Sequence, residues 1–134
     1  MGGGLSEIRG KSADNPVSLL GEGLDWVIID EAARLSTLDY VVRTIALPMT
    51  LNTGGRVVLV STPAPTADHP FKEYCEESIR RGTYLERTIY DNPRVDDKTI
   101  AEYMDESGGE ESTEWQREYL VRHVTDLDRA IIKA

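Results

Sequence analysis

Two short apolar runs, each followed at once by polar residues, organise the first half of the chain. In residues 24–29 four consecutive positions are apolar, without alternation, and an acidic pair follows at residues 30–31. Such a run predicts a strand that is covered on both faces, as in a parallel sheet, with Trp26 packed in the interior. Residues 56–60 form a second β-branched run, which predicts a strand that ends at the hydroxyl-rich residues 61–63.

Apolar residues recur at steps of three and four in two further segments, which predicts helices with one apolar face. The first stripe consists of Leu35, Leu38, Val42, Ile45 and Met49. Ser36 or Thr37 should cap this helix, and Pro48 should end it because proline lacks the backbone N–H. The second helix should have Pro70 in its first turn, with Asp68 or His69 before it, and should end at Gly82. Its stripe consists of Phe71, Tyr74, Cys75 and Ile79.

Turn residues and polar stretches divide the rest of the chain. Residues 1–23 are rich in glycine and are expected to be mostly loop. Residues 83–90 are rich in strand formers and partly alternating, which predicts a third strand. Residues 96–107 and 111–123 are expected to be two helices separated by a pair of glycines.

The last predicted helix should begin at Ser112 or Thr113 and turn Trp115 and Tyr119 toward the core. Residues 96–118 contain nine acidic residues and two basic ones. This charge indicates a solvated helical face, and the alternative is a docking surface for a basic partner.

Strands that alternate with helices imply an α/β fold class, with a mainly parallel sheet, flanking helices and additional helices at the carboxyl end. In such a sheet, ligands bind at the edge formed by the carboxyl ends of the strands. Both of the first two predicted strands end in polar residues there. The sequence therefore places its candidate chemistry at that edge.

Composition narrows the function classes. The chain has 134 residues, 15 Lys and Arg against 24 Asp and Glu, and a formal net charge of −9. This acidity argues against a stand-alone DNA binder, because affinity for the phosphate backbone comes from Lys and Arg. The single Cys75 excludes an intramolecular disulfide, and no apolar run is long enough to span a bilayer. His69 and His123 lack metal-ligand spacing, so we expect surface or capping roles for them.

An apolar strand followed by Asp30-Glu31 has the form of a Walker B motif. In P-loop NTPases the Asp of this motif helps to hold the Mg²⁺ that bridges the nucleotide phosphates. A Glu directly after it can orient and deprotonate the attacking water. Ser61 and Thr62, at the end of the next strand, could sense the γ-phosphate. The alternatives are acidic residues that favour a helix N-terminus and plain turn chemistry.

Five motifs occur in an order that is more specific than any of them alone. They are LLGEGLD (19–25), DEAA (30–33), GR (55–56) leading to STP (61–63), YDNP (90–93) and WQREYL (115–120). Together they resemble the later half of the ATPase domain of tailed-bacteriophage terminase large subunits. The resemblance covers nearly the whole chain and implies a partial P-loop NTPase (RecA-like) domain.

The resemblance implies a viral DNA-packaging motor, in which ATP hydrolysis drives double-stranded DNA into the procapsid. ATP and Mg²⁺ would be its cofactors. Asp30 matches the Mg²⁺-associated acid and Glu31 the catalytic Glu of the family. Ser61, Thr62 and Pro63 match the motif that couples hydrolysis to DNA movement.

The resemblance also implies an organisation and a set of partners. Residues 1–93 would be the Walker B-containing part of the ATPase core, and residues 94–134 an acidic helical subdomain with the start of a linker toward a nuclease domain. Asp126 and Asp128 form a D-x-D pair there, which we interpret as part of a solvated tail. The implied partners are the portal and the small terminase subunit, with a ring of large subunits, no membrane contact and a location in the host cytoplasm.

The chain departs from the family pattern at two places. The phosphate-binding Walker A motif, G-x-x-x-x-G-K-[ST], is absent from this chain. We therefore expect a fragment or a split gene product, and no ATP hydrolysis by the isolated chain. Leu20 stands where many relatives carry an arginine that is proposed as an arginine finger, and Arg9, Arg34 and Arg43 are weaker substitutes.

Two other functions remain open on the sequence. A helicase-like ATPase fragment would carry similar strand-end acids and hydroxyls. A non-catalytic acidic docking module with a decayed ATPase fold would keep the fold but not the chemistry.

Overall fold

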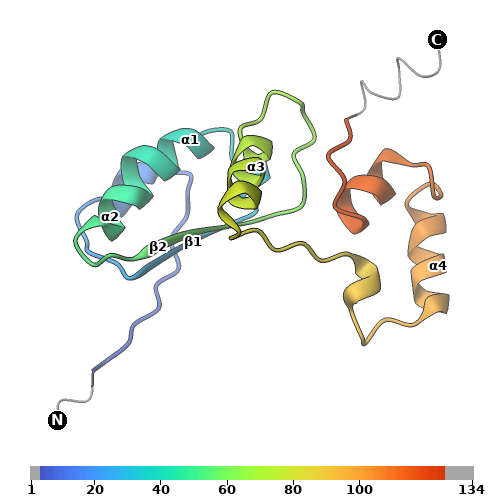
Figure 1. Cartoon of the computed structure of the whole chain (residues 1–134), viewed down its shortest axis with the longest axis horizontal. Helices are drawn as coiled ribbons and strands as arrows, with labels where there is room; N and C mark the ends of the chain where they lie inside the picture. The colour runs from blue at the N-terminus through green and yellow to red at the C-terminus, as the bar shows by residue number, and fades with distance from the viewer. Residues whose placement is uncertain (1–3, 126–134) are drawn as a thin grey trace. The chain divides into compact units, whose positions relative to one another are not determined.

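The computed structural model describes residues 4–125, so Asp126 and Asp128 lie outside the described residues (Figure 1). Its longest elements are the helices α3 and α4, its two strands have five residues each, and its η elements are short 3-10 or π-helical segments. In chain order the elements are η1 (Pro16–Leu19), β1 (Trp26–Asp30), η2 (Ala32–Arg34), α1 (Leu38–Tyr40), η3 (Val41–Ala46), α2 (Leu47–Leu51), β2 (Arg56–Val60), α3 (Phe71–Arg81), η4 (Ile89–Asp91), α4 (Asp97–Glu106) and η5 (Trp115–Tyr119).

The described residues divide into two compact units. Those up to Ile28, together with Asp39–Val58, form the first unit. Ile29–Leu38, together with the described residues from Leu59 onward, form the second. The boundary falls inside both strands, so each unit is described on its own.

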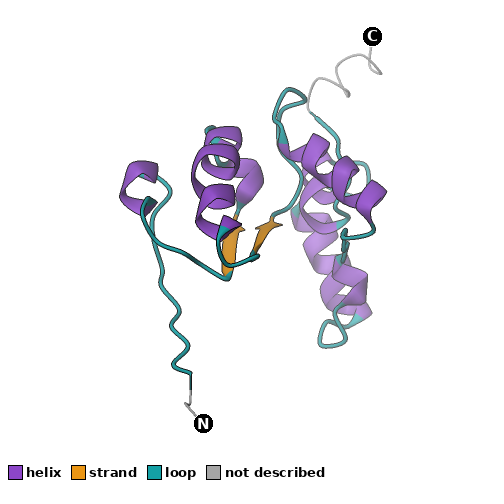
Figure 2. Ribbon diagram, turned by 60° about the vertical axis from the view of Figure 1, so that its left-hand side comes forward, coloured by secondary structure: helices purple, strands orange, loops and turns teal. Residues whose placement is uncertain are grey.

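β1 and β2 pair as a two-stranded parallel sheet, and this small sheet with its helices is compatible with the α/β class (Figure 2). Between them, α1, η3 and α2 follow one another without a break and form one helical run. At the entrance to the sheet, the Leu24 N–H donates to the Met49 carbonyl oxygen at 2.8 Å. The Arg56 N–H donates to the Asp25 carbonyl oxygen at 2.9 Å, so β2 begins beside β1.

Gly55 marks the closest approach of the two chain segments at this entrance. A Cβ at this position would lie 2.5 Å from the Asp25 carbonyl oxygen and 2.6 Å from the Leu24 carbonyl oxygen. Because both contacts are to backbone, no side chain could give way. The absence of a side chain at residue 55 is therefore a condition for this pairing.

The helical run begins at Leu38, directly after the predicted cap residues, and buries the middle of the predicted apolar stripe, whereas Leu35 precedes the run and Met49 is half-buried. Its buried apolar residues are Leu38, Val41, Val42, Ile45 and Ala46. Pro48 does not end the run, as predicted, but lies in the first turn of α2, which continues to Leu51. The prediction fails because η3, which precedes Pro48, is π-helical. In a regular α-helix the proline ring would clash with the carbonyl four residues earlier, but the wider π-helical turn has a different hydrogen-bonding pattern and accommodates the ring.

The prediction that both faces of β1 are covered is wrong. Trp26 is 57% exposed and Ile28 is 65% exposed, whereas Ile29 on the opposite face is buried. The reason is that helices cover only one face of a sheet that has two strands. On the exposed face, Trp26 instead makes a cation–π contact with Arg56, whose guanidinium carbon lies 5.8 Å from the centroid of the Trp26 ring.

In the second unit, α3 begins at Phe71, one residue later than predicted, and has the predicted end. It follows Pro70 and ends at Gly82, which adopts a left-handed conformation (φ 69°) and donates its N–H to the Ile79 carbonyl oxygen. Phe71 is buried, and Cys75, predicted to lie in the core, is half-buried. α4 also confirms its prediction, with the Asp96 side chain accepting the Thr99 N–H at the N-cap.

Residues 83–88 form an extended connection without strand pairing, so the predicted third strand is wrong (Figure 1). Leu85, on the alternating pattern, is 73% exposed. At the end of the segment, the Asp91 side chain accepts the Thr88 N–H at 2.7 Å, and η4 follows. Such local side-chain bonds satisfy the backbone without a partner strand.

The final predicted helix is shorter than expected. Ser112 caps it as predicted, with its Oγ accepting the Trp115 N–H at 3.0 Å. The helix ends at Tyr119 rather than near residue 123, and Val121 has a positive φ of 57°. Across residues 4–125, no helix combines the length and apolarity that crossing a membrane requires.

Candidate functional site

The acidic pair lies where β1 ends. Asp30 is the last residue of the strand and Glu31 is the residue after it, and both side chains are exposed. The Asp30 Oδ1 accepts the Glu31 N–H at 2.9 Å. Glu31 has left-handed backbone angles (φ 51°, ψ 39°), which cost a residue other than glycine about 1 kcal/mol. Such strain is typical of residues whose side chains have a function.

The turn after Glu31 is tightly packed within the second unit. The Arg34 N–H donates to the Glu31 carbonyl oxygen at 2.8 Å and closes η2. Ala32 and Ala33, within that turn, are buried. Their small side chains allow the close packing that holds the strained residue in place.

Ser61 joins the two strand ends. Its Oγ, in the first residue after β2, accepts the Ala33 N–H at 3.1 Å. Pro63, two residues further on, is fully buried and fixes the course of the loop. The loop that follows the acidic pair and the loop that follows β2 therefore meet at the same end of the sheet.

Thr62 points to a different partner, Glu118 of η5. The Thr62 Oγ1 donates to the Glu118 Oε2 at 2.7 Å. The Arg34 Nη2 donates to the Glu118 Oε1 at 2.6 Å, and the Arg117 Nε donates to the same oxygen at 3.0 Å. We call Arg34, Thr62, Arg117 and Glu118 the Glu118 cluster. It connects η5 to residues from both strand-end loops.

The Glu118 carboxylate is ionised near neutral pH. Burial by itself raises the pKa of Glu118, but hydrogen bonds from Thr62, Arg117 and Arg34 lower it, and the net pKa lies below its ordinary value. The Arg117 side chain is 13% exposed, and its Nη1 is buried without a hydrogen-bond partner among the described residues. Loss of the Glu118 charge would therefore leave a buried guanidinium poorly compensated.

Aromatic packing holds the segment that carries Glu118. Trp115, 1% exposed, stacks on Tyr119 with ring centroids 5.0 Å apart. Tyr119 in turn contacts Tyr103 of α4 edge to face at 5.9 Å. Movement of Glu118 would therefore change the packing of the Trp115 and Tyr119 rings.

His69 has the capping role that the sequence predicted. Its Nδ1 accepts the Phe71 N–H at 3.2 Å at the start of α3, and its Nε2 lies 3.0 Å from the Leu35 carbonyl oxygen. These partners fit a neutral ring with the proton on Nε2. Burial raises the pKa of the Cys75 thiol to about 11, which disfavours the reactive thiolate.

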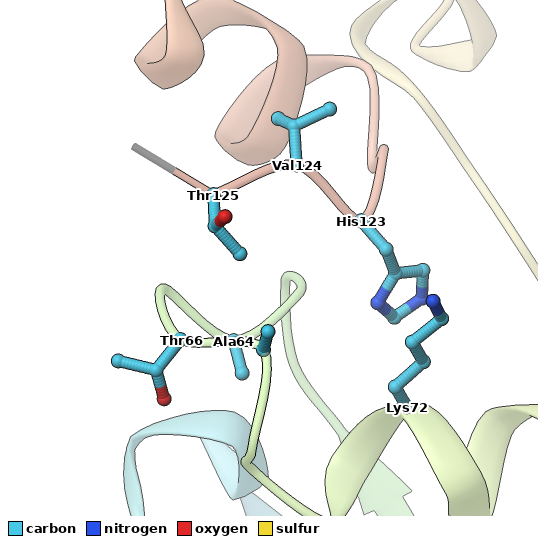
Figure 3. A pocket seen from close by; sticks show the side chains of 7 residues that line it. Ala64, Thr66, Lys72, His123, Val124 and Thr125 are labelled. Atoms are coloured by element: carbon cyan, nitrogen blue, oxygen red, sulfur yellow. The ribbon is translucent and has the colours of Figure 1, made fainter. Parts of the chain in front are cut away.

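A pocket of about 380 Å³ opens elsewhere in the second unit (Figure 3). Lys72 and His123 face each other on one side of it, with Ala64 and Thr125 among the other lining residues. Burial, and after it the charge of Lys72, lowers the pKa of His123. Neither the acidic pair nor Ser61 nor Thr62 lines the pocket, so it is separate from the candidate site.

The acidic pair suits a metal ion that arrives with a nucleotide. Within the described part of the chain, no group of three or more His, Cys, Asp or Glu side chains is arranged to hold a metal. Mg²⁺ bound to a nucleotide needs only one or two protein carboxylates, because phosphates and waters supply its other ligands. Asp30 uses Oδ1 for the Glu31 N–H, and its exposed carboxylate fits that requirement.

The chain is similar to two terminase large subunits over part of its length. A stretch of 59 residues is 46% identical to the terminase large subunit of Thermus phage G20c and to that of Thermus virus P23-45. This match supports the terminase large-subunit family. The matched stretch is 43% of this chain and only 12% of each relative. No family model matches the chain, and no solved structure matches it significantly.

The Glu118 cluster is the part of the site that sequence reasoning missed. Eight of the nine acidic residues in residues 96–118 are exposed, as expected for a solvated face, and Glu118 is the exception. Arg34, considered as a substitute arginine finger, is engaged by Glu118. The position of Glu118 within WQREYL, between aromatic residues, was the available signal.

Proposed function

We propose that this chain supplies the Walker B part of the P-loop ATPase domain of a viral DNA-packaging motor, the terminase large subunit. The hydrogen bond from the Ala33 N–H to the Ser61 Oγ carries the proposal, because it brings the loop after the acidic pair and the loop after β2 together. The partial match to two terminase large subunits supports the same assignment.

In this proposal each strand-end residue has a chemical role. Asp30 helps to hold Mg²⁺, which when bound neutralises phosphate charge. Glu31 orients the attacking water and accepts its proton, and its exposed carboxylate is accessible to such a water. Ser61 and Thr62 respond to the γ-phosphate, and buried Pro63 keeps their loop rigid. The Walker A motif that cradles the phosphates is supplied by polypeptide outside this sequence.

The proposed substrate of the motor is double-stranded DNA, moved into a procapsid at the expense of ATP. With a net charge of −9, this chain is suited to the ATPase role rather than to DNA contact. Basic surfaces for the DNA belong to other parts of the motor. We propose that the partners of the chain are the portal and the small terminase subunit, and that the large subunits form a ring in the host cytoplasm.

The proposal is tested in a completed protein, in which this chain is fused behind a terminase segment that carries a Walker A motif. Glu31→Gln should lower ATP turnover by about a hundredfold or more, because it removes the general base. Glu73→Gln, at an exposed position of α3, is the matched control and should leave turnover unchanged. Turnover that is the same in both variants would contradict the proposal.

A non-catalytic acidic docking module is the second candidate. The eight exposed carboxylates among residues 96–118 favour it. On this alternative, Glu31→Ala would leave every activity of the assembled protein unchanged. Loss of DNA packaging on that substitution would exclude it.

A further inference from the structure

Glu118 links both strand-end loops of the candidate ATP site to a helical segment more than fifty residues further along the chain. We infer that Glu118 is a positioning residue that holds the Thr62 hydroxyl when no γ-phosphate is present and releases it when one is bound. This inference rests on the proposed function. It adds that the Thr62 hydroxyl exchanges Glu118 for the γ-phosphate as its hydrogen-bond acceptor. This exchange sets the affinity for ATP and makes η5 respond to the bound nucleotide.

The exchange follows from the number of donors at Thr62. A threonine hydroxyl has one O–H to donate. The ionised carboxylate of Glu118 and the oxygens of a phosphate can only accept hydrogen bonds. In this structure the Thr62 Oγ1 donates to the Glu118 Oε2 at 2.7 Å. Thr62 therefore cannot donate to Glu118 and to a γ-phosphate at the same time.

Glu118 can lose Thr62 and remain a satisfied anion. Its other oxygen, Oε1, accepts from Arg34 at 2.6 Å and from Arg117 at 3.0 Å. Arg117 is largely buried beside it, so a charged partner stays in place after Thr62 leaves. The carboxylate thus serves as a fixed holding point rather than as a group that must be reprotonated at each cycle.

The position of Glu118 provides the connection to η5. Glu118 directly precedes Tyr119, whose ring stacks on Trp115 and contacts Tyr103. Loss of the hydrogen bond from Thr62 to Glu118 would therefore change the packing of these three aromatic rings. Since Trp115 is buried and this chain has only one other tryptophan, Trp115 becomes the single tryptophan reporter when Trp26 and any tryptophan of the fused segment are replaced by phenylalanine.

The first readout is the KM for ATP of the completed protein and of its variants. Glu118→Gln removes the charge that holds Thr62, and we expect its KM for ATP to fall about tenfold, because a neutral amide oxygen accepts from Thr62 more weakly than a carboxylate and competes less with the nucleotide. Glu114→Gln changes an exposed glutamate of the same helical turn and should leave KM unchanged. Thr62→Val keeps the side-chain shape and removes the donor.

The second readout is Trp115 emission with Mg·ADP and with Mg·ADP plus beryllium fluoride, a mimic of the γ-phosphate. The emission should differ between these two states in this single-tryptophan protein. The difference should disappear with Thr62→Val and return with Thr62→Ser, which restores the hydroxyl. If Glu118→Gln fails to fold, as judged by circular dichroism, the two Thr62 variants decide the question.

The outcomes separate this inference from the proposed function. If Glu31→Gln abolishes turnover while Glu118→Gln matches Glu114→Gln and Thr62→Val keeps the Trp115 difference, the ATPase assignment stands and the exchange at Thr62 is refuted. If Glu31→Gln has no effect on turnover, the proposed function itself is wrong.

Discussion

Replacing Gly55 by alanine should destabilise the protein far more than the same change at its neighbour Gly54. The added Cβ at residue 55 would lie 2.5 Å from the Asp25 carbonyl oxygen and 2.6 Å from the Leu24 carbonyl oxygen. Non-bonded atoms do not approach so closely, so the entrance to β2 must move away from the segment before β1. At residue 54 the added Cβ meets nothing within 4 Å, and only its positive φ of 65° opposes alanine.

The magnitude follows from the bonds that this movement breaks. The Arg56 N–H donates to Asp25 at 2.9 Å, and the Thr53 Oγ1 donates to Leu24 at 2.6 Å. Two such bonds contribute about 2 kcal/mol, and overpacking adds about 1–3 kcal/mol. The lower entropy of the unfolded alanine variant returns about 0.5–1 kcal/mol. Gly55→Ala should therefore lower the free energy of unfolding by about 2–4 kcal/mol, against about 1 kcal/mol for Gly54→Ala.

Urea unfolding followed by far-UV circular dichroism measures both variants against the parent chain. A lower unfolding midpoint for Gly55→Ala than for Gly54→Ala, at an unchanged slope, is the expected result. Equal midpoints would refute the argument, because they would mean that the close approach before β1 is not part of the folded protein. The result matters for the site, since β2 carries Ser61 and Thr62 at its other end.

Two further predictions concern titrating groups. The pKa of Glu118 is lowered in the folded state, so its ionised form contributes stability above the ordinary pKa of 4.5, and this contribution is lost as the pH falls through the folded pKa. The difference in urea midpoint between the parent chain and Glu118→Gln should therefore be largest near pH 7 and shrink in acid as the pH falls through the lowered pKa of Glu118, and a difference that does not change with pH would contradict the role of its charge. Cys75, with its pKa raised to about 11, should react with iodoacetamide at pH 8 roughly a hundredfold more slowly than an exposed cysteine, as mass spectrometry can follow. Equally fast modification would show that the thiol is not desolvated.

The elements that sequence reasoning predicted well are those set by local interactions. α3 lies between Pro70 and Gly82 because these two residues favour its first turn and its left-handed end, whatever surrounds it. α4 has its Asp96 cap for the same reason. Both strands follow from short β-branched runs, and their polar ends follow directly from the residue order.

The failures depend on contacts that a local pattern does not contain. Trp26 was expected to be covered because its strand is apolar throughout, but coverage depends on how many elements pack against the sheet. Residues 83–88 have strand-forming residues, but no neighbouring strand is available to pair with them, and Thr88 and Asp91 bond locally instead. Glu118 resembled its acidic neighbours in sequence, and only the folded chain brings Arg34 and Thr62 to it.

The backbone of Glu31 has a consequence for any attempt to stabilise this protein. Its left-handed angles suit glycine or asparagine better than glutamate, so either replacement relieves about 1 kcal/mol of strain. A screen for heat resistance alone would reward that replacement. The most thermostable variants would then lack the proposed general base, Glu31. Thermostability and ATP turnover must therefore be selected together at this position.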